Sequence, residues 1–212
     1  MTAGMNTRVR SWMMSIVVTR LVRPPAVTLT TRAVPAAETV YVPTRHGPVR
    51  CLITRPARDA PLVVGGAPVP VTVNMHGGGF LVGNPRQDDH LVRGIAGEVG
   101  SVVVNVDYST SPRARFPKAL EECFDVLQWV ARSADTMGWD AGRIAVTGGS
   151  AGANLALGLL TLAGRGGGPA VRAAALLVPA VDLSISPQVV VSPIAKPFVN
   201  AGLLRMVDAS YF

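Results

Sequence analysis

The residue best placed to do chemistry is Ser150, at the centre of the run Gly148-Gly149-Ser150-Ala151-Gly152. An alternating apolar stretch, residues 143–147, precedes this run, and an almost continuous apolar stretch, residues 154–160, follows it. The pattern predicts a tight turn between a buried strand and a buried helix. A serine hydroxyl on such a turn is a candidate nucleophile, because the glycines relieve crowding where strand and helix cross.

A second glycine-rich run, His76-Gly77-Gly78-Gly79-Phe80, follows the β-branched stretch of residues 69–75. Its glycines would let backbone N–H groups turn inward toward a developing oxyanion. In a parallel sheet the loops that follow the strands lie along one edge, so we expect this run to meet the run around Ser150.

Metal and nucleotide sites are not indicated. The histidines are His46, His76 and His90, and neither they nor Cys51 and Cys123 show a metal-ligand spacing. The glycine spacings match neither a Walker A loop nor GxGxxG. We therefore expect no metal and no cofactor. His46 is expected in an exposed turn, and His90 at the surface or in packing.

Strand and helix patterns alternate along the chain and predict an α/β fold, a mostly parallel sheet with helices on both faces. The predicted core begins with two strands joined by a turn at residues 46–48. The uncharged stretch 144–164 is predicted to be a core strand and helix rather than a membrane span. The expected strands are 39–42, 49–54, 69–75, 101–107, 143–147 and 171–178, and the expected helices are 87–99, 118–137 and 151–163.

The basic residues gather at the N-terminus: residues 1–58 hold nine arginines against Glu38 alone. No nucleic-acid motif accompanies them, so nucleic-acid binding is not expected. The segment before Pro24-Pro25 is predicted to be an amphipathic helix that lies over a pocket or contacts a membrane surface. A signal peptide is disfavoured because arginines interrupt the pattern, so the expected location is cytoplasmic, with membrane-peripheral contact as an option.

The sequence resembles the hormone-sensitive-lipase-like esterases of the α/β-hydrolase fold over roughly residues 36–190. GxSxG alone is a weak signal, but GxSxG with HGGG about seventy residues upstream is a strong one. The resemblance rests on His76-Gly77-Gly78-Gly79-Phe80, on Val106-Asp107-Tyr108 with Pro112 and Phe116-Pro117, and on the stretch from Arg143 to Leu155.

The resemblance implies a carboxylic ester hydrolase, an esterase or lipase, that needs no cofactor and acts on a small ester. Ser150 would be the nucleophile, and the N–H groups of Gly77, Gly78 and Ala151 would hold the oxyanion. Motif support would come from His76, Gly79, Gly148 and Gly152. The chain departs from the family where Gly149 replaces a common aspartate, where Ala153 replaces a glycine, and where Ser109-Thr110-Ser111 replaces Arg-Leu-Ala.

The catalytic triad of this fold runs Ser, Asp or Glu, then His along the chain, yet no histidine follows Ser150. Only Asp182 and Asp208 supply acids there, and Asp182 is expected to cap a turn. The interpretation is a C-terminally truncated hydrolase that lacks its last strands and has very low activity, with an exposed sheet edge that promotes self-association. The alternative is a non-catalytic ligand-binding homologue. The expected division is a cap-type or amphipathic segment at 1–35, the core at 36–190 and the start of a lid at 191–212.

Overall fold

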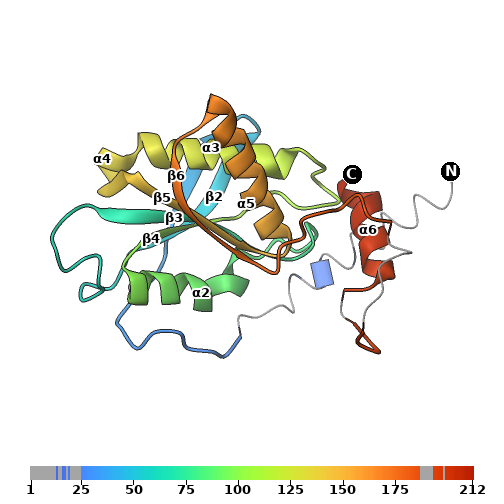
Figure 1. Ribbon diagram of the computed structural model, residues 1–212, viewed down its shortest axis with the longest axis horizontal. Coiled ribbons are helices and arrows are strands. Elements are labelled where there is room, and N and C mark those ends of the chain that lie inside the picture. The colour runs from blue at the N-terminus through green and yellow to red at the C-terminus, as the bar shows by residue number, and fades with distance from the viewer. Residues whose placement is uncertain (1–12, 14–15, 18, 20–24, 187–192, 198) are drawn as a thin grey trace.

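The computed structural model describes residues 13, 16–17, 19, 25–186, 193–197 and 199–212 (Figure 1). The expected N-terminal amphipathic helix lies largely outside these residues. The strands are β1 (Glu38–Thr44), β2 (Gly47–Thr54), β3 (Val69–Met75), β4 (Val102–Val106), β5 (Trp139–Gly149) and β6 (Val171–Leu177). The helices are η1 (Pro85–Asp88), α2 (Asp89–Gly94), η2 (Ile95–Val99), α3 (Lys118–Arg132), α4 (Ala134–Met137), α5 (Ala151–Leu162), η3 (Ala163–Gly167) and α6 (Ala201–Tyr211).

The six strands form one sheet in the order β1-β2-β4-β3-β5-β6. The β1–β2 and β2–β4 pairs are antiparallel, and the β4–β3, β3–β5 and β5–β6 pairs are parallel. The predicted α/β class with a mostly parallel sheet is therefore confirmed. Since β3 and β5 are parallel neighbours, their carboxyl ends lie side by side at the edge where both glycine-rich runs begin.

Helices cover both faces of the sheet, with α2 on one face and α3, α4 and α5 on the other (Figure 1). The strand β4 lies between these two helix layers, and all five of its residues are buried. Its Val102, Val104 and Val106 belong to the larger apolar cluster, whereas Val103 packs with Val92 and Ala96 of the α2 and η2 region. Two buried faces explain a strand that is apolar at nearly every position.

Several element boundaries differ from the sequence-based expectation. The expected helix at 87–99 is divided into η1, α2 and η2, the expected helix at 118–137 is broken at Ser133 into α3 and α4, and the glycine-rich turn after α5 begins with the helical turn η3. The carboxyl group of Asp88, just before α2, makes no capping bond to that helix. It accepts a hydrogen bond at 3.2 Å from the side-chain amide of Asn74, a buried residue of β3.

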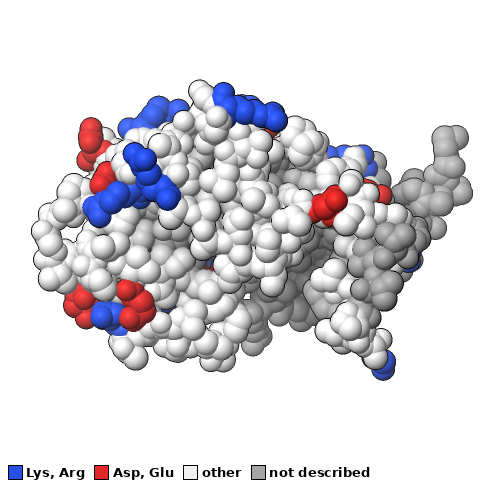
Figure 2. Space-filling model, in the orientation of Figure 1, with Lys and Arg blue, Asp and Glu red and all other residues white. Residues whose placement is uncertain are grey.

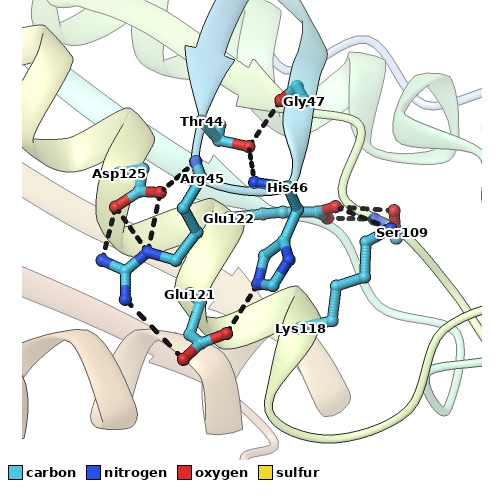
Figure 3. A network of polar contacts seen from close by, with 9 residues as sticks. All are labelled: Thr44, Arg45, His46, Gly47, Ser109, Lys118, Glu121, Glu122 and Asp125. Atoms are coloured by element: carbon cyan, nitrogen blue, oxygen red, sulfur yellow. Dashed lines mark hydrogen bonds and ion pairs between the residues drawn. The ribbon is translucent and has the colours of Figure 1, made fainter.

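The turn between β1 and β2 is fastened to α3 by a polar network (Figure 3). Asp125 of α3 accepts hydrogen bonds from the backbone N–H and from the guanidinium of Arg45, at 2.8 and 2.7 Å. His46 is exposed in the turn, as expected, and its Nε2 lies 2.6 Å from Glu121. The antiparallel end of the sheet is thereby held against the helix layer.

Candidate active site

Ser150 lies at the sharp turn between β5 and α5. Its backbone has φ 52° and ψ −114°, a conformation that non-glycine residues rarely adopt and that is held only where the surroundings impose it. The Ser150 N–H donates to the Leu177 carbonyl at 2.9 Å, and the Ser150 carbonyl accepts from the N–H of Asn154 at 3.1 Å. Bonds to β6 on one side and to α5 on the other therefore fix the turn.

The glycines beside Ser150 differ in what surrounds them. A Cβ on Gly148 or Gly152 would overlap backbone atoms of β3 or of the start of α5. A Cβ on Gly149 would meet nothing within 4 Å. The crowding explains two of the three glycines of the run, and the position at which the family commonly has aspartate has room for a side chain.

The run that starts at His76 touches the Ser150 turn, as the parallel sheet predicted. A Cβ on Gly77 would lie 3.1 Å from the Gly149 carbonyl oxygen and 3.9 Å from the Ser150 Cβ. The backbone then turns through positive φ angles of 117° at Gly78 and 60° at Gly79. Glycine at these positions permits the loop to curl around the turn.

The two segments that meet here contain the backbone N–H groups of Gly77, Gly78 and Ala151. Among the loop hydrogen bonds of the described residues, none uses the N–H of Gly77 or Gly78. Ala151 is the first residue of α5, so its N–H has no acceptor within the helix. The N-terminus of α5 also carries the positive end of the helix dipole, which favours negative charge beside Ser150.

His76 is buried within its own loop. Its Nδ1 lies 2.8 Å from the Gly77 carbonyl oxygen and 3.1 Å from the Gln87 amide nitrogen, and its ring stacks on Tyr108 with 4.3 Å between centroids. Burial lowers the pKa of His76, against a smaller raising effect of the Gly77 hydrogen bond. The imidazole is therefore neutral at pH 7, and its contacts are with the loop rather than with the Ser150 hydroxyl.

A cavity of about 1150 Å³ opens beside Ser150. One wall is the segment of residues 178–186, and the other is α6. The helix α6 docks through Tyr211, whose ring stacks on Phe80 at 4.0 Å and whose carbonyl accepts from the Phe116 N–H at 2.8 Å. Phe80, which follows HGGG, thus holds in place the cavity wall opposite the Ser150 turn. The sequence did not predict this contact.

The acids that follow Ser150 have separate places. Asp182 accepts from the N–H and hydroxyl of Ser184 at 2.9 and 2.6 Å, so the predicted turn cap is confirmed. Asp208 lies on α6 and lines the cavity. His90 is half-buried on α2.

Among the described residues, no three side chains of His, Cys, Asp or Glu converge as metal ligands would. Within the same residues, no helix is both long and apolar enough to cross a bilayer.

Comparison with known proteins bears directly on this geometry. A family profile described as alpha/beta hydrolase fold matches residues 72–212. The chain belongs to the α/β-hydrolase family. Its β3–loop and β5–turn–α5 units are the parts of that fold that carry the HGGG and GxSxG motifs.

Individual relatives place this α/β-hydrolase with the hormone-sensitive-lipase-like esterases, as the motifs indicated. Human hormone-sensitive lipase is 35% identical over 136 residues, which are 64% of this chain and 12% of that protein. Versiconal hemiacetal acetate esterase of Dothistroma septosporum is 44% identical over 91 residues, 42% of this chain and 27% of that protein. The matched part of the chain therefore spans 27% or less of the length of these two curated relatives.

A solved structure extends the likeness over the whole chain. The hyperthermophilic esterase from the archaeon Pyrobaculum calidifontis superposes with a TM-score of 0.72 at 31% identity. The match covers 99% of this α/β-hydrolase chain and 65% of the esterase.

Proposed function

We propose that this chain carries the nucleophile and the oxyanion-binding donors of a carboxylic ester hydrolase. The observation that carries the proposal is the strained Ser150 turn, which the HGGG loop touches and which opens onto the cavity. Esterases and lipases among the relatives support the same reaction class. The cavity walls include Val178, Val181, Leu183 and Met206, so the substrate is a small ester with an apolar portion.

In the proposed reaction the Ser150 Oγ attacks the ester carbonyl carbon, and the carbonyl oxygen becomes an oxyanion. The N–H groups of Gly77, Gly78 and Ala151 stabilise that oxygen, and one such donor is typically worth about 10²–10³ in rate. Collapse of the intermediate breaks the bond to the alkoxide, which takes up the serine proton and leaves as the alcohol. Water then attacks the acyl-serine, restoring the Ser150 hydroxyl and releasing the carboxylic acid.

The proton transfers need a base, and none of the three histidines, all of which lie among the described residues, forms a hydrogen bond with Ser150. His46 contacts Glu121, His76 is buried in its loop, His90 lies on α2, and no histidine follows Ser150 in the sequence. Loss of triad residues typically costs about 10⁶ in turnover. The proposed activity of this 212-residue chain is therefore very low.

We propose the same division of the chain that the sequence indicated. The assignment of residues 191–212 to the start of a lid is supported by α6, which makes one wall of the cavity beside Ser150. The assignment of residues 1–35 to a cap-type or amphipathic segment is supported by the Thr19 hydroxyl, which accepts a hydrogen bond from the Gly83 N–H at 3.3 Å, just beyond the HGGG loop. Residues 36–190 would be the core between them.

Hydrolysis of p-nitrophenyl acetate by the purified chain and its Ser150→Ala variant tests the proposal. We expect slow release of p-nitrophenol that Ser150→Ala reduces to the rate in buffer. Turnover at the level of an intact triad, abolished by Ser150→Ala, would show that a base does reach Ser150. Saturable ester binding with no Ser150-dependent release would favour the non-catalytic binding homologue instead.

A further inference from the structure

The loop that follows β4 lies against the HGGG loop. The Tyr108 hydroxyl donates to the His76 carbonyl oxygen at 2.6 Å, and the two rings stack with an angle of 11° between their planes. Further along the same loop, the Ser111 N–H donates to the Phe80 carbonyl at 2.7 Å. His76, which begins the HGGG loop, and Phe80, which follows it, are thus both tied to the loop after β4.

Tyr108 itself has almost no freedom. Its side chain is 2% exposed, and burial raises the pKa of Tyr108 well above its usual value, so the hydroxyl keeps its proton and donates. The carbonyl that it binds belongs to the peptide unit whose N–H is that of Gly77. Fixing the His76 oxygen therefore fixes the direction of the Gly77 N–H, because the peptide unit is planar.

A buried carboxylate holds the next residue. Glu122 of α3 is 2% exposed, and its two oxygens accept from the Ser109 N–H at 2.7 Å and from the Ser109 hydroxyl at 2.8 Å (Figure 3). Lys118 Nζ lies 3.8 Å from the same carboxylate. A buried charge that accepts two hydrogen bonds is costly to move, so α3 anchors the loop that carries Tyr108.

We propose that Tyr108 is a positioning residue for the oxyanion donors, fixed in turn by Glu122 through Ser109; the proposal rests on the proposed function of the Ser150 turn. Tyr108 does not touch the reacting atoms. It orients the Gly77 N–H through the His76 carbonyl, and Ser109, which bonds to Glu122, stands where the family commonly has an arginine after this tyrosine.

The test uses Tyr108→Phe in a Ser150→Cys background, because a thiolate attacks esters without a neighbouring base. Intact mass spectrometry follows acylation by p-nitrophenyl acetate. We expect the limiting acylation rate to fall about tenfold, part of the 10²–10³ that a lost oxyanion donor costs, with the half-saturating ester concentration unchanged. Tyr41→Phe is the matched control, since Tyr41 is 65% exposed on β1, and its rate should equal that of the parent.

Ser109→Ala gives a second, gentler variant that keeps the Tyr108 ring and hydroxyl. It removes one of the two bonds to Glu122, so we expect a smaller loss of rate in the same direction. Equal acylation rates in the parent, Tyr108→Phe and Ser109→Ala would overturn the proposal.

Hydrogen exchange separates this inference from the proposed function. Tyr108→Phe should speed amide exchange in a peptide covering residues 76–82 and leave exchange in α3 unchanged. If Ser150→Cys is not acylated at all, the proposed function fails, yet faster exchange at 76–82 still supports the tether. Unchanged exchange at 76–82 contradicts the tether whatever the acylation result.

Discussion

A Cβ atom on Gly152 would lie 1.9 Å from the carbonyl oxygen of Met75, at the end of β3. The first turn of α5 and the end of β3 are therefore in backbone contact, with hydrogen as the only side chain that fits. This contact brings the Ser150 turn and the HGGG loop together, since His76 follows Met75 directly.

Gly152→Ala should destabilise the chain by about 1–3 kcal/mol, because neither backbone can retreat without moving a buried strand. Urea unfolding followed by circular dichroism measures the loss. Gly149→Asp is the matched control in the same run, where an added Cβ meets nothing within 4 Å. That variant should stay within about 0.5 kcal/mol of wild type. Equal losses in the two variants would refute the crowding argument.

The Arg45–Asp125 pair should make stability depend on pH. Burial raises the pKa of Asp125, but the side-chain and backbone hydrogen bonds from Arg45 together outweigh it, so the pKa lies below its usual value. A lowered carboxyl pKa contributes stability above the unfolded value of about 3.9, and that stability is lost as pH falls through the folded pKa.

Asp125→Asn should therefore lower the free energy of unfolding at pH 7 and flatten its decline between about pH 5 and pH 2. Urea titrations at a series of pH values measure both effects. Asp135→Asn, at an exposed position on α4, serves as the control and should leave the profile unchanged. Identical slopes for wild type and Asp125→Asn would exclude the pair as the source of the acid sensitivity.

The free edge of β6 should promote self-association. Ala173, Ala174 and Ala175 are exposed on this strand, and β6 is the last strand of the sheet within the described residues. Charged side chains are sparse over the middle of the face in Figure 2, where β6 and α5 lie. The opposite edge, β1, carries Glu38 and Pro43, which discourage strand pairing.

Ala174→Lys should accordingly shift the chain toward monomer in sedimentation velocity, because a lysine on an edge strand opposes pairing with another chain. Thr39→Lys places the same charge on the exposed side of β1 and should change little. A wild-type chain that stays monomeric at high concentration would count against association through this edge.

The sequence predicted the fold class, the meeting of the two glycine-rich runs and the turn cap at Asp182, because each depends on local pattern or on the geometry of parallel strands. The crowding at Gly148 and Gly152 was also foreseeable, since a strand and helix that cross at a tight turn leave no room for a Cβ. The free space at Gly149 could not be foreseen. The glycines of the run are identical in sequence, and only the packing of the folded chain shows which of them is crowded.

Long-range polar contacts were the part that could not be predicted. Glu122 lies in an amphipathic helix where a carboxylate ordinarily faces water, yet the fold buries it against Ser109. Tyr108 stood in a recognised motif, but nothing in its spacing pointed to the His76 carbonyl. The stacking of Tyr211 on Phe80 likewise joins residues that are far apart in sequence, so no local pattern predicts it.

Exchanging the Oγ atom of Ser150 for sulfur tests whether this residue is a well-placed nucleophile that no base activates. Acylation by p-nitrophenyl acetate at pH 9 is compared for wild type, Ser150→Ala and Ser150→Cys, with peptide mapping to locate the acetyl group. Cys51 and Cys123 are both fully buried, and burial raises the pKa of Cys51 to about 12, so the introduced thiol is the reactive one.

We predict rapid acetylation of the introduced thiol in Ser150→Cys, slow acetylation of Ser150 in wild type and none at this position in Ser150→Ala. Wild-type acylation as fast as that of Ser150→Cys would show that a base activates the serine. A thiol at position 150 that reacts no faster in the folded chain than in the chain unfolded by urea would contradict the oxyanion site itself.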